Sequence, residues 1–350
     1  MMMKQIRCWT MNIARPGRRR RGGGAMQMVG AIRAVSSAAG IALACGVGLP
    51  LAAQTPTVAI DHDESAGKLA VVIDDQPAVT YQYGRQYALP HYWPLRSPTG
   101  KSLTAQHPEP YPHHRSVWIA DKVQAGDGPV VDFYHCWKNY NTADDPASGC
   151  RHFIRHCQFQ DVSVSDGEAT VSSTSSWIVN QSQAVLTERR RLRVTALGGG
   201  EYVMDLSWQL TPVDADVRFL SDWVHYAWPY LRMAPEFSVE RGGTLQSDAG
   251  RRGQKETNGE PARWIDYSNT VEGTAEGLTV FLFPDGERHK WLTRDYGTFG
   301  PRRAERYSGT QFVLRQGESL DGRVGILVHR GDVDADRVVE RVQQYIEQQQ

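Results

Sequence analysis

The chain has little cysteine, no long apolar run and none of the usual spacings of metal ligands. Only five of its 350 residues are cysteine, and no two of them form a CxxC pair, which argues against a structural zinc site. No HExxH or His-x-His spacing occurs, so the signature of a metalloprotease is missing. Beyond residue 53 no apolar run approaches the ~20 residues of a membrane-spanning helix. We therefore expect no resident metal, no cofactor and no membrane span after that position.

Acidic residues are missing from the first 53 positions, which hold eight basic ones. The basic run Arg18 to Arg21 is followed by a stretch of small and apolar residues from Ala38 to Ala53. This order is typical of a secretory signal peptide, so we predict that residues 1–53 are removed and that the mature protein is periplasmic or secreted. A retained anchor or a basic tail is the alternative.

Without that segment the charge is no longer balanced. Positions 54–350 hold 31 basic and 39 acidic residues, a net charge of about −8. Nucleic-acid binding needs a basic face that neutralises phosphate, so we expect no nucleic-acid partner. Three cysteines remain in this part, Cys136, Cys150 and Cys157, and an oxidising compartment favours a disulfide, with Cys136–Cys150 the preferred pair. Three buried thiols are the alternative.

Helical patterns are also scarce, and short segments of alternating apolar and polar residues stand in their place. Such segments, bounded by turn-forming residues, are typical of β-strands. Strands are predicted at residues 58–61, 68–74, 78–83, 170–179, 184–195, 201–210, 264–267, 278–283, 309–315 and 323–328. The glycines at 198–200 suit a hairpin loop between two of these strands.

One helix is predicted, at the C-terminus, with Asp334 as its cap. Its apolar face would hold Val338, Val339, Val342, Tyr345 and Ile346. Many short strands, Gly- and Pro-rich turns and one closing helix indicate an all-β fold. We predict that residues 54–350 form a single domain, a large antiparallel β-sandwich with a C-terminal helix. The galactose-mutarotase-like supersandwich is one form that such a sandwich takes.

The densest group of reactive side chains lies in the segment Tyr111 to Trp118. His113 and His114 can act as acid, base or metal ligand near neutral pH, and Arg115 offers a fixed positive fork. In a strand, alternation places His113 and Arg115 on one side and His114 on the other, so we expect one histidine at a site and the other in a structural role. Seven histidines fall within about one-fifth of the chain: His91, His107, His113, His114, His135, His152 and His156.

A second group lies at residues 221–230, where aromatic rings are dense. It contains Asp222, Trp223, His225 and Trp228. Aromatic planes pack well on the C–H face of a sugar ring, so these residues are candidates for a sugar site. Burial of the rings in the core is the alternative.

A third group comprises residues 263–267, which contain Asp266, together with 283–289 and 291–297. Arg294 and Tyr296 stand two positions apart, so on a strand they share a face. Such a pair suits the binding of a carboxylate or the stabilisation of an enolate. A surface arginine paired with Asp295 is the alternative.

Three segments in order resemble the PmoA-like family of exported bacterial proteins. Leu95 to Gly100, Pro112 to Trp118 and Val131 to Phe133 are similar to its "PLRTPDG", "HPHHRSLW" and "VDFW" segments. The sequence departs from them at Tyr111 and Tyr134, where the family has His and Trp. The resemblance implies an exported, carbohydrate-associated protein. The methane-oxygenase label of that family is not supported by this chain, because a membrane oxygenase subunit needs spanning helices.

These observations together predict an exported carbohydrate-active protein, a glycoside-cleaving hydrolase or lyase whose ligand is a carbohydrate or glycoside. The candidate catalytic residues are His113, His114, Arg115, Asp266 and Arg294. The candidate substrate-binding residues are Trp118, His135, Asp222, Trp223, His225, Trp228 and Tyr296. A non-catalytic sugar-binding protein is the first alternative. The second is a metal enzyme that uses two or three of His113, His114, His135 and His152.

Overall fold

Long antiparallel strands dominate the computed structural model. It describes residues 55–136, 152–221, 227–284, 287, 289–304, 312–333 and 335–349. Residues from Thr55 onward form one unit, and the predicted signal segment 1–53 lies outside the described residues. No helix in the described ranges is long and apolar enough to cross a membrane.

The first sheet has eight strands, and each hydrogen-bonded pair of neighbours in it is antiparallel. Their order is β1 (Val58–Asp63), β2 (Lys68–Ile73), β3 (Gln76–Gln82), β4 (His91–Leu95), β5 (Val117–Trp118), β13 (Tyr230–Arg232), β18 (Thr298–Pro301) and β17 (Trp291–Thr293). This sheet brings together segments that lie far apart in the sequence, which matters for the site below.

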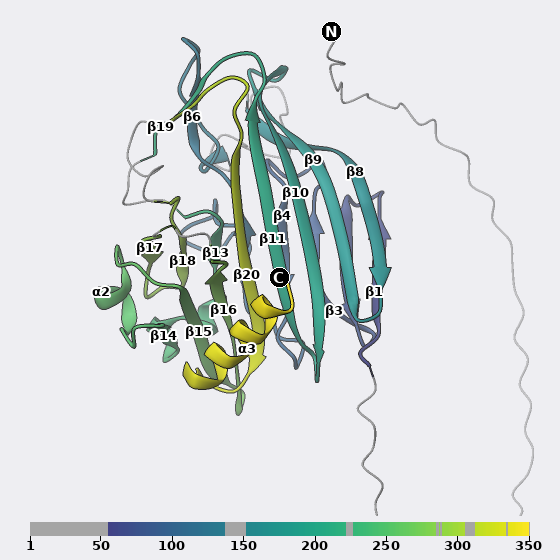
Figure 1. Ribbon diagram of the computed structural model, residues 1–350, viewed down its shortest axis with the longest axis vertical. Coiled ribbons are helices and arrows are strands. Elements are labelled where there is room, and N and C mark those ends of the chain that lie inside the picture. The colour runs from purple at the N-terminus through teal and green to yellow at the C-terminus, as the bar shows by residue number, and fades with distance from the viewer. Residues whose placement is uncertain are drawn as a thin grey trace, which may run out of the picture. The chain divides into compact units, whose positions relative to one another are not determined.

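The second sheet also has eight antiparallel strands, and they are longer. Their order is β14 (Thr244–Ser247), β15 (Trp264–Val271), β16 (Thr274–Leu282), β20 (Leu320–Arg330), β11 (Glu201–Pro212), β10 (Gln183–Gly198), β9 (Glu168–Val179) and β8 (Phe153–Ser165). Figure 1 shows these strands side by side, with helix α3 (Ala335–Glu347) crossing β20 and β16. The predicted hairpin loop at 198–200 joins β10 to β11.

Shorter elements complete the fold. A four-stranded sheet contains β19 (Phe312–Leu314), β12 (Val217–Phe219), β6 (Lys122–Ala125) and β7 (Val131–Asp132). The remaining elements are the 3-10 turns η1 (Pro235–Phe237) and η2 (Val239–Arg241) and the short helix α2 (Gly253–Thr257).

The core lies between the two large sheets. Along β10, Leu192 and Val194 are buried while Arg189 and Arg191 are exposed, which is the alternation expected of a strand with one buried face. One cluster of buried apolar side chains includes Val71 of the first sheet together with residues of the second, such as Leu192 and Val194. Two sheets that share a core make a β-sandwich. The predicted all-β antiparallel sandwich with a C-terminal helix is therefore confirmed.

Helix α3 packs on the outer face of the second sheet. Val338, Val342, Tyr345 and Ile346 form a second apolar cluster with residues of β11, β15, β16 and β20: Val203, Trp264, Phe281 and Leu327. Val339, expected on the same face, is 42% exposed, because at 100° per residue it lies beyond the edge of the buried stripe. The expected cap, Asp334, lies outside the described residues.

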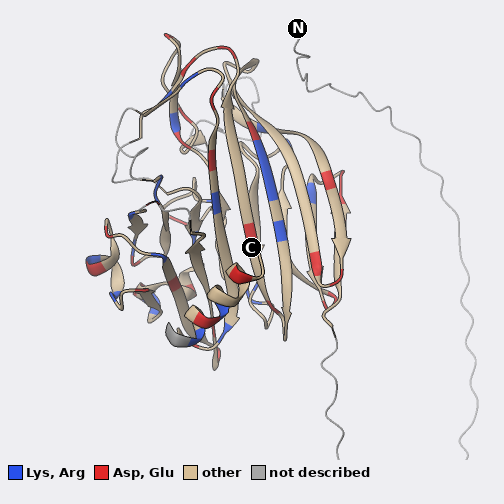
Figure 2. Cartoon of the chain, viewed as in Figure 1, with Lys and Arg blue, Asp and Glu red and all other residues tan. Residues whose placement is uncertain are grey.

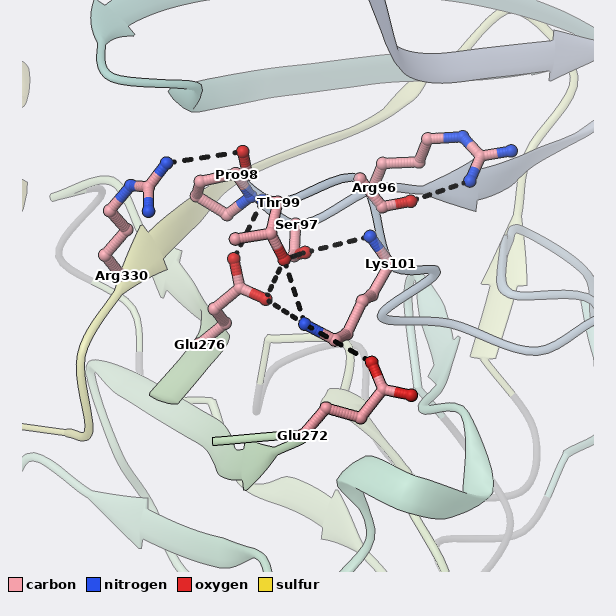
Figure 3. A network of polar contacts seen from close by, with 9 residues as sticks. Arg96, Ser97, Pro98, Thr99, Lys101, Glu272, Glu276 and Arg330 are labelled. Carbon is pink, nitrogen blue, oxygen red and sulfur yellow. Dashed lines mark hydrogen bonds and ion pairs between the residues drawn. The ribbon is translucent and has the colours of Figure 1, made fainter. Parts of the chain in front are cut away.

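The segment Leu95 to Gly100, which resembles the first family motif, connects the two large sheets. The backbone N–H and hydroxyl of Thr99 donate to the two carboxylate oxygens of Glu276 on β16, at 2.9 and 2.7 Å (Figure 3). Lys101 lies 3.7 Å from the same carboxylate, and Arg330 at the end of β20 donates to the carbonyl of Pro98 at 3.4 Å. Glu276 is fully buried. These contacts fasten the loop after β4 to the second sheet.

The segment after residue 150 holds two of the candidate histidines. Of the candidate histidines, His152 directly precedes strand β8 and His156 lies in it, and the alternation pattern missed this strand. His156 packs against Tyr83 and Phe159, with ring centroids 4.6 and 4.3 Å away.

Neither Cys136 nor Cys157 is joined in a disulfide within the described residues, and Cys150 lies outside them, so the pairing stays a prediction.

Candidate functional site

The two adjacent histidines lie in a turn ahead of β5. The backbone N–H of His114 donates to the carbonyl of Tyr111 at 3.0 Å, and the N–H of His107 donates to the carbonyl of His114 at 2.8 Å. The imidazole centroids of His113 and His114 are 4.5 Å apart, so both rings join one cluster. The prediction that they point to opposite sides is wrong, because a turn does not alternate as a strand does. Both side chains are buried.

Tyrosine rings surround this histidine pair. Tyr111 stacks on His114 at 5.0 Å and on Tyr296 at 4.9 Å, and Tyr134 meets His113 edge-on at 5.1 Å. All three tyrosines are partly exposed. The cluster therefore has a buried floor of imidazoles and a partly exposed rim of tyrosine rings.

Hydrogen-bonding groups connect the buried imidazoles to the partly exposed tyrosine rings. Nε2 of His114 lies 2.9 Å from the hydroxyl of Tyr134, and its Nδ1 lies 3.3 Å from the hydroxyl of Thr298 on β18. Burial, assisted by the neighbouring His113 and Arg232, lowers the pKa of His114 to about 2, so this imidazole is neutral. Burial raises the pKa of Tyr134, so its phenol keeps its proton. At neutral pH the pair is thus a neutral imidazole held against a protonated phenol.

Asp132 and His135 form a second polar pair at the rim. Oδ2 of Asp132 accepts from Nδ1 of His135 at 2.8 Å, and Oδ1 accepts from the His135 backbone N–H at 3.1 Å. Burial acts to raise the pKa of Asp132, but the hydrogen bonds and charge of His135 outweigh it and the net shift is downward. The side chain of His135 is 38% exposed. With Nδ1 held by the carboxylate, Nε2 is the nitrogen that can exchange a proton with a ligand.

This second pair belongs to the same cluster. The ring centroid of His135 lies 4.6 Å from that of His113 and 4.6 Å from that of Tyr134. An imidazole oriented by a carboxylate and a protonated phenol therefore stand next to each other. Two such groups meet the requirement of general acid–base catalysis, in which one group takes a proton and the other gives one.

The two predicted catalytic arginines have different surroundings. Arg115 is 1% exposed and donates from Nη1 to the carbonyl of His113 at 3.0 Å, which fixes the backbone of the turn. Arg294 is partly exposed and donates to the side-chain oxygen of Asn258 and to the carbonyl of Thr293, both at 2.8 Å. Its positive charge reaches Tyr134 and Tyr296. Arg294 thus belongs to the rim, whereas Arg115 supports it from inside.

Asp266, a candidate catalytic carboxylate, is separated from this cluster. It lies on β15, fully buried, where it accepts from the hydroxyl of Thr279 at 2.7 Å and pairs with Nε2 of His329 at 2.7 Å. Two positions before it, Trp264 packs under α3, so Asp266 points to that outer face. The next residue, Tyr267, points the other way and donates to the carbonyl of Arg294. The structure therefore does not bring Asp266 to the histidines.

The predicted aromatic binding residues are also divided. Trp118 is fully buried and stacks on Tyr230 at 5.0 Å and on Tyr134 at 5.9 Å, so it backs the cluster without reaching a ligand. Trp228 packs edge-on against Phe219 at 5.5 Å instead of joining the histidine rings. Tyr296 lies on the rim, as described above. Asp222, Trp223 and His225 lie outside the described residues.

Sequence reasoning missed three contributors: Asp132, Tyr134 and Arg232. The signal for Asp132 was its position three residues before His135, a spacing at which a turn lets a carboxylate meet the following imidazole. Tyr134 stood out only as a departure from the family motif. Arg232 had no local signal, because its neighbours in the cluster come from distant segments.

A separate groove of about 730 Å³ crosses the outer face of the second sheet. Its lining includes Arg189, Arg191, Trp208 and Arg323. Figure 2 shows a run of Lys and Arg positions, in blue, along the ribbon of β10. Arg191 is exposed and forms no ion pair with another described residue. This groove lies on the solvent side of the sheet, away from the core.

Metal ligation was one alternative for the histidines. Within the described ranges, no group of three or more His, Cys, Asp or Glu side chains is arranged to hold a metal ion. The rings of His113 and His135 instead pack against each other and against tyrosines.

Comparison with known sequences places the chain in a family. The profile of the family of unknown function DUF6807 matches residues 68–343. The chain belongs to that family. No curated protein is similar to it in sequence.

Two solved structures match most of this chain at low similarity. The galactose 1-epimerase from Lactobacillus acidophilus NCFM has 8% identity and a TM-score of 0.32, with 79% of this chain and 99% of that one covered. The GalM/aldose epimerase homologue from C. elegans has 8% identity and a TM-score of 0.29, with 80% of this chain and 100% of that one covered.

Proposed function

We propose that this member of the DUF6807 family is an exported carbohydrate-active enzyme that cleaves a glycosidic bond by acid–base chemistry, as a hydrolase or a lyase. The observation behind the proposal is the Asp132–His135 pair, held at 2.8 Å and partly exposed beside the protonated phenol of Tyr134. Such a pair is the arrangement that a general base and a general acid need.

Each residue of the cluster has a role in this proposal. His135 exchanges the proton through Nε2, and Asp132 fixes the ring and its tautomer through Nδ1. Tyr134 is the second proton carrier, and neutral His114 holds its hydroxyl. The partly exposed rings of Tyr111 and Tyr296 offer apolar faces to a sugar ring.

The roles differ from those expected of the sequence segment alone. His113 and His114 are buried, so they support the site, and the exposed His135 takes the proton-transfer role. Arg294 contributes positive charge at the rim. Export to the periplasm or the medium rests on the signal-like segment 1–53 and on the resemblance to the PmoA-like family.

The test is a screen of glycosides with the mature protein, with products identified by mass spectrometry. Cleavage with uptake of one water identifies a hydrolase, and cleavage without water identifies a lyase. The His135→Ala variant is expected to lose roughly 10²- to 10⁴-fold in kcat/KM on any substrate found. His156→Ala, whose ring packs on Tyr83 elsewhere, should keep full activity. Sugar binding without any mass change would refute the enzyme and favour the non-catalytic sugar-binding protein.

A further inference from the structure

Arg232 is a buried arginine at the end of β13. Only 4% of its surface is exposed, and its guanidinium carbon lies 4.9 Å from the ring centroid of Tyr296 on the rim. In the sheet Arg232 pairs with Thr298, whose hydroxyl contacts His114. Its positive charge also acts on His114 directly. Arg232 therefore belongs to the same cluster as the acid–base residues.

No described residue neutralises this arginine. It forms no ion pair in the described ranges, and its Nε and Nη1 are buried without a hydrogen-bond partner. The negative charge of Glu240 acts on Arg232 only from beyond ion-pair distance. Burial lowers the pKa of the guanidinium. A buried cation with unused donors is costly, and nearly all buried polar groups in proteins have partners.

A second buried arginine in the same sandwich shows the usual solution. Arg190 is 3% exposed, but its guanidinium donates to the carboxylate of the fully buried Glu188. Arg190 also donates to the carbonyl of Pro90 at 3.4 Å. Glu188 thus supplies a carboxylate to the buried Arg190, whereas no carboxylate of the described residues lies within ion-pair distance of Arg232.

We propose that Arg232 binds the carboxylate of an acidic sugar, and that the substrate class is a glycoside of a uronic acid. This inference rests on the proposed function, since it assigns the ligand of the same cluster. One unpaired positive charge matches one negative charge, and the planar guanidinium fork fits a carboxylate through two parallel hydrogen bonds. The partly exposed edge of Tyr296 would contact the sugar while Arg232 holds the acid group.

The test compares ligands that differ only at carbon 6 of the sugar. Glucuronic and galacturonic acid, their methyl esters, glucose, galactose and the 6-sulfates of the two hexoses are titrated into the mature protein by calorimetry. The uronic acids are expected to bind roughly tenfold or more tightly than the esters and the hexoses, because a hydrogen-bonded charge pair is lost in both. The same preference is expected in His135→Ala, which removes proton transfer and keeps the arginine.

Three arginine variants locate the effect. Arg232→Met should weaken uronate binding roughly 10- to 100-fold and abolish the preference over the ester. Arg232→Lys keeps the charge without the fork and should lie between Met and wild type. Arg191→Met removes an exposed, unpaired arginine of the outer groove and should leave binding unchanged. The melting temperature of Arg232→Met should not fall, since the change removes a buried charge that has no partner.

Each result of these experiments supports or overturns the inference about Arg232. Equal binding of uronate and ester by the wild type, or an equal loss in Arg191→Met, overturns the inference, and it does so even if Arg232→Met fails to fold. Tighter binding of the 6-sulfates than of the uronates overturns the carboxylate assignment. Arg232-dependent uronate binding without any cleavage supports this inference and refutes the enzyme. Cleavage of neutral glycosides that Arg232→Met leaves unchanged supports the enzyme and refutes this inference.

Discussion

The protein contains two Asp–His pairs of nearly equal length in very different surroundings. Asp132 and His135 are 2.8 Å apart, with side chains 29% and 38% exposed. Asp266 and His329 are 2.7 Å apart, with side chains 0% and 3% exposed beneath α3. The same chemistry at the same distance thus stands in two surroundings, one open to solvent and one enclosed by the fold. The predictions below separate the two.

The largest expected effect is on turnover. His135→Ala should lower kcat/KM by roughly 10²- to 10⁴-fold, the usual contribution of a general acid or base. His329→Ala should leave the activity of each folded molecule unchanged, because its ring lies beneath α3 on the other face of the second sheet. Steady-state kinetics with protein corrected for folded fraction measures both. A comparable loss in the two variants would end the distinction.

For stability the ranking of the two histidine variants is reversed. His329→Ala leaves the carboxylate of Asp266 buried with only Thr279 as partner, so the free energy of unfolding should fall by about 3–5 kcal/mol. His135→Ala breaks an exposed pair and should cost about 1 kcal/mol or less. Urea unfolding of both variants gives the numbers, and their comparison needs no substrate.

The tie at Glu276 offers a third polar group, buried like Asp266 but bonded mainly to backbone and hydroxyl donors. Glu276→Gln replaces one acceptor oxygen with an amide donor, so it should lower the free energy of unfolding by about 1–3 kcal/mol. Activity should be retained at temperatures where the variant is folded. Thr99→Val, which removes only the hydroxyl donor, is the matched control and should cost less.

The smallest effect is on the pH dependence of stability, where the pairs should differ in sign. Burial opposes the charge of His329, but Asp266 outweighs it and raises the histidine pKa above 6.5. This contribution is present below pH 6.5 and is lost as pH rises through the folded-state pKa. The pKa of Asp132 is lowered below 3.8, so its contribution is present above that pH and is lost as pH falls.

Unfolding curves at several pH values check this difference. The gap in unfolding free energy between wild type and His329→Ala should narrow toward alkaline pH. The gap between wild type and Asp132→Asn should narrow toward acid pH. Parallel behaviour of the two gaps would contradict the assignment of charge to the two pairs.

The local pattern of the sequence predicts much of the fold. Alternation along 184–195 and 201–210 gives β10 and β11, and the glycines between them give the hairpin. The stripe of Val338, Val342, Tyr345 and Ile346 gives α3. These features are local because side-chain alternation and helical periodicity are set by the backbone geometry of a few consecutive residues.

The site was predicted less completely, for a physical reason. His113, His114, His135, Arg294 and Tyr296 were chosen from dense segments, and the fold does bring them together. Asp266 was chosen from the polar and aromatic segment 263–267, and its strand turns it to the other face. Asp132 was overlooked as part of an apolar motif, although its spacing to His135 allowed the contact.

The sequence by itself determined the strands, the closing helix and the short stretches in which reactive side chains are concentrated, because these depend on neighbours along the chain. The tertiary structure alone decided which of those side chains share a site. Sheet order places β5, β13 and β18 next to each other, so His114, Arg232 and Tyr296 meet although more than a hundred residues separate the first from the others. Burial then decides which histidine keeps access to a ligand and which arginine is left without a partner, and burial is a property of the whole fold.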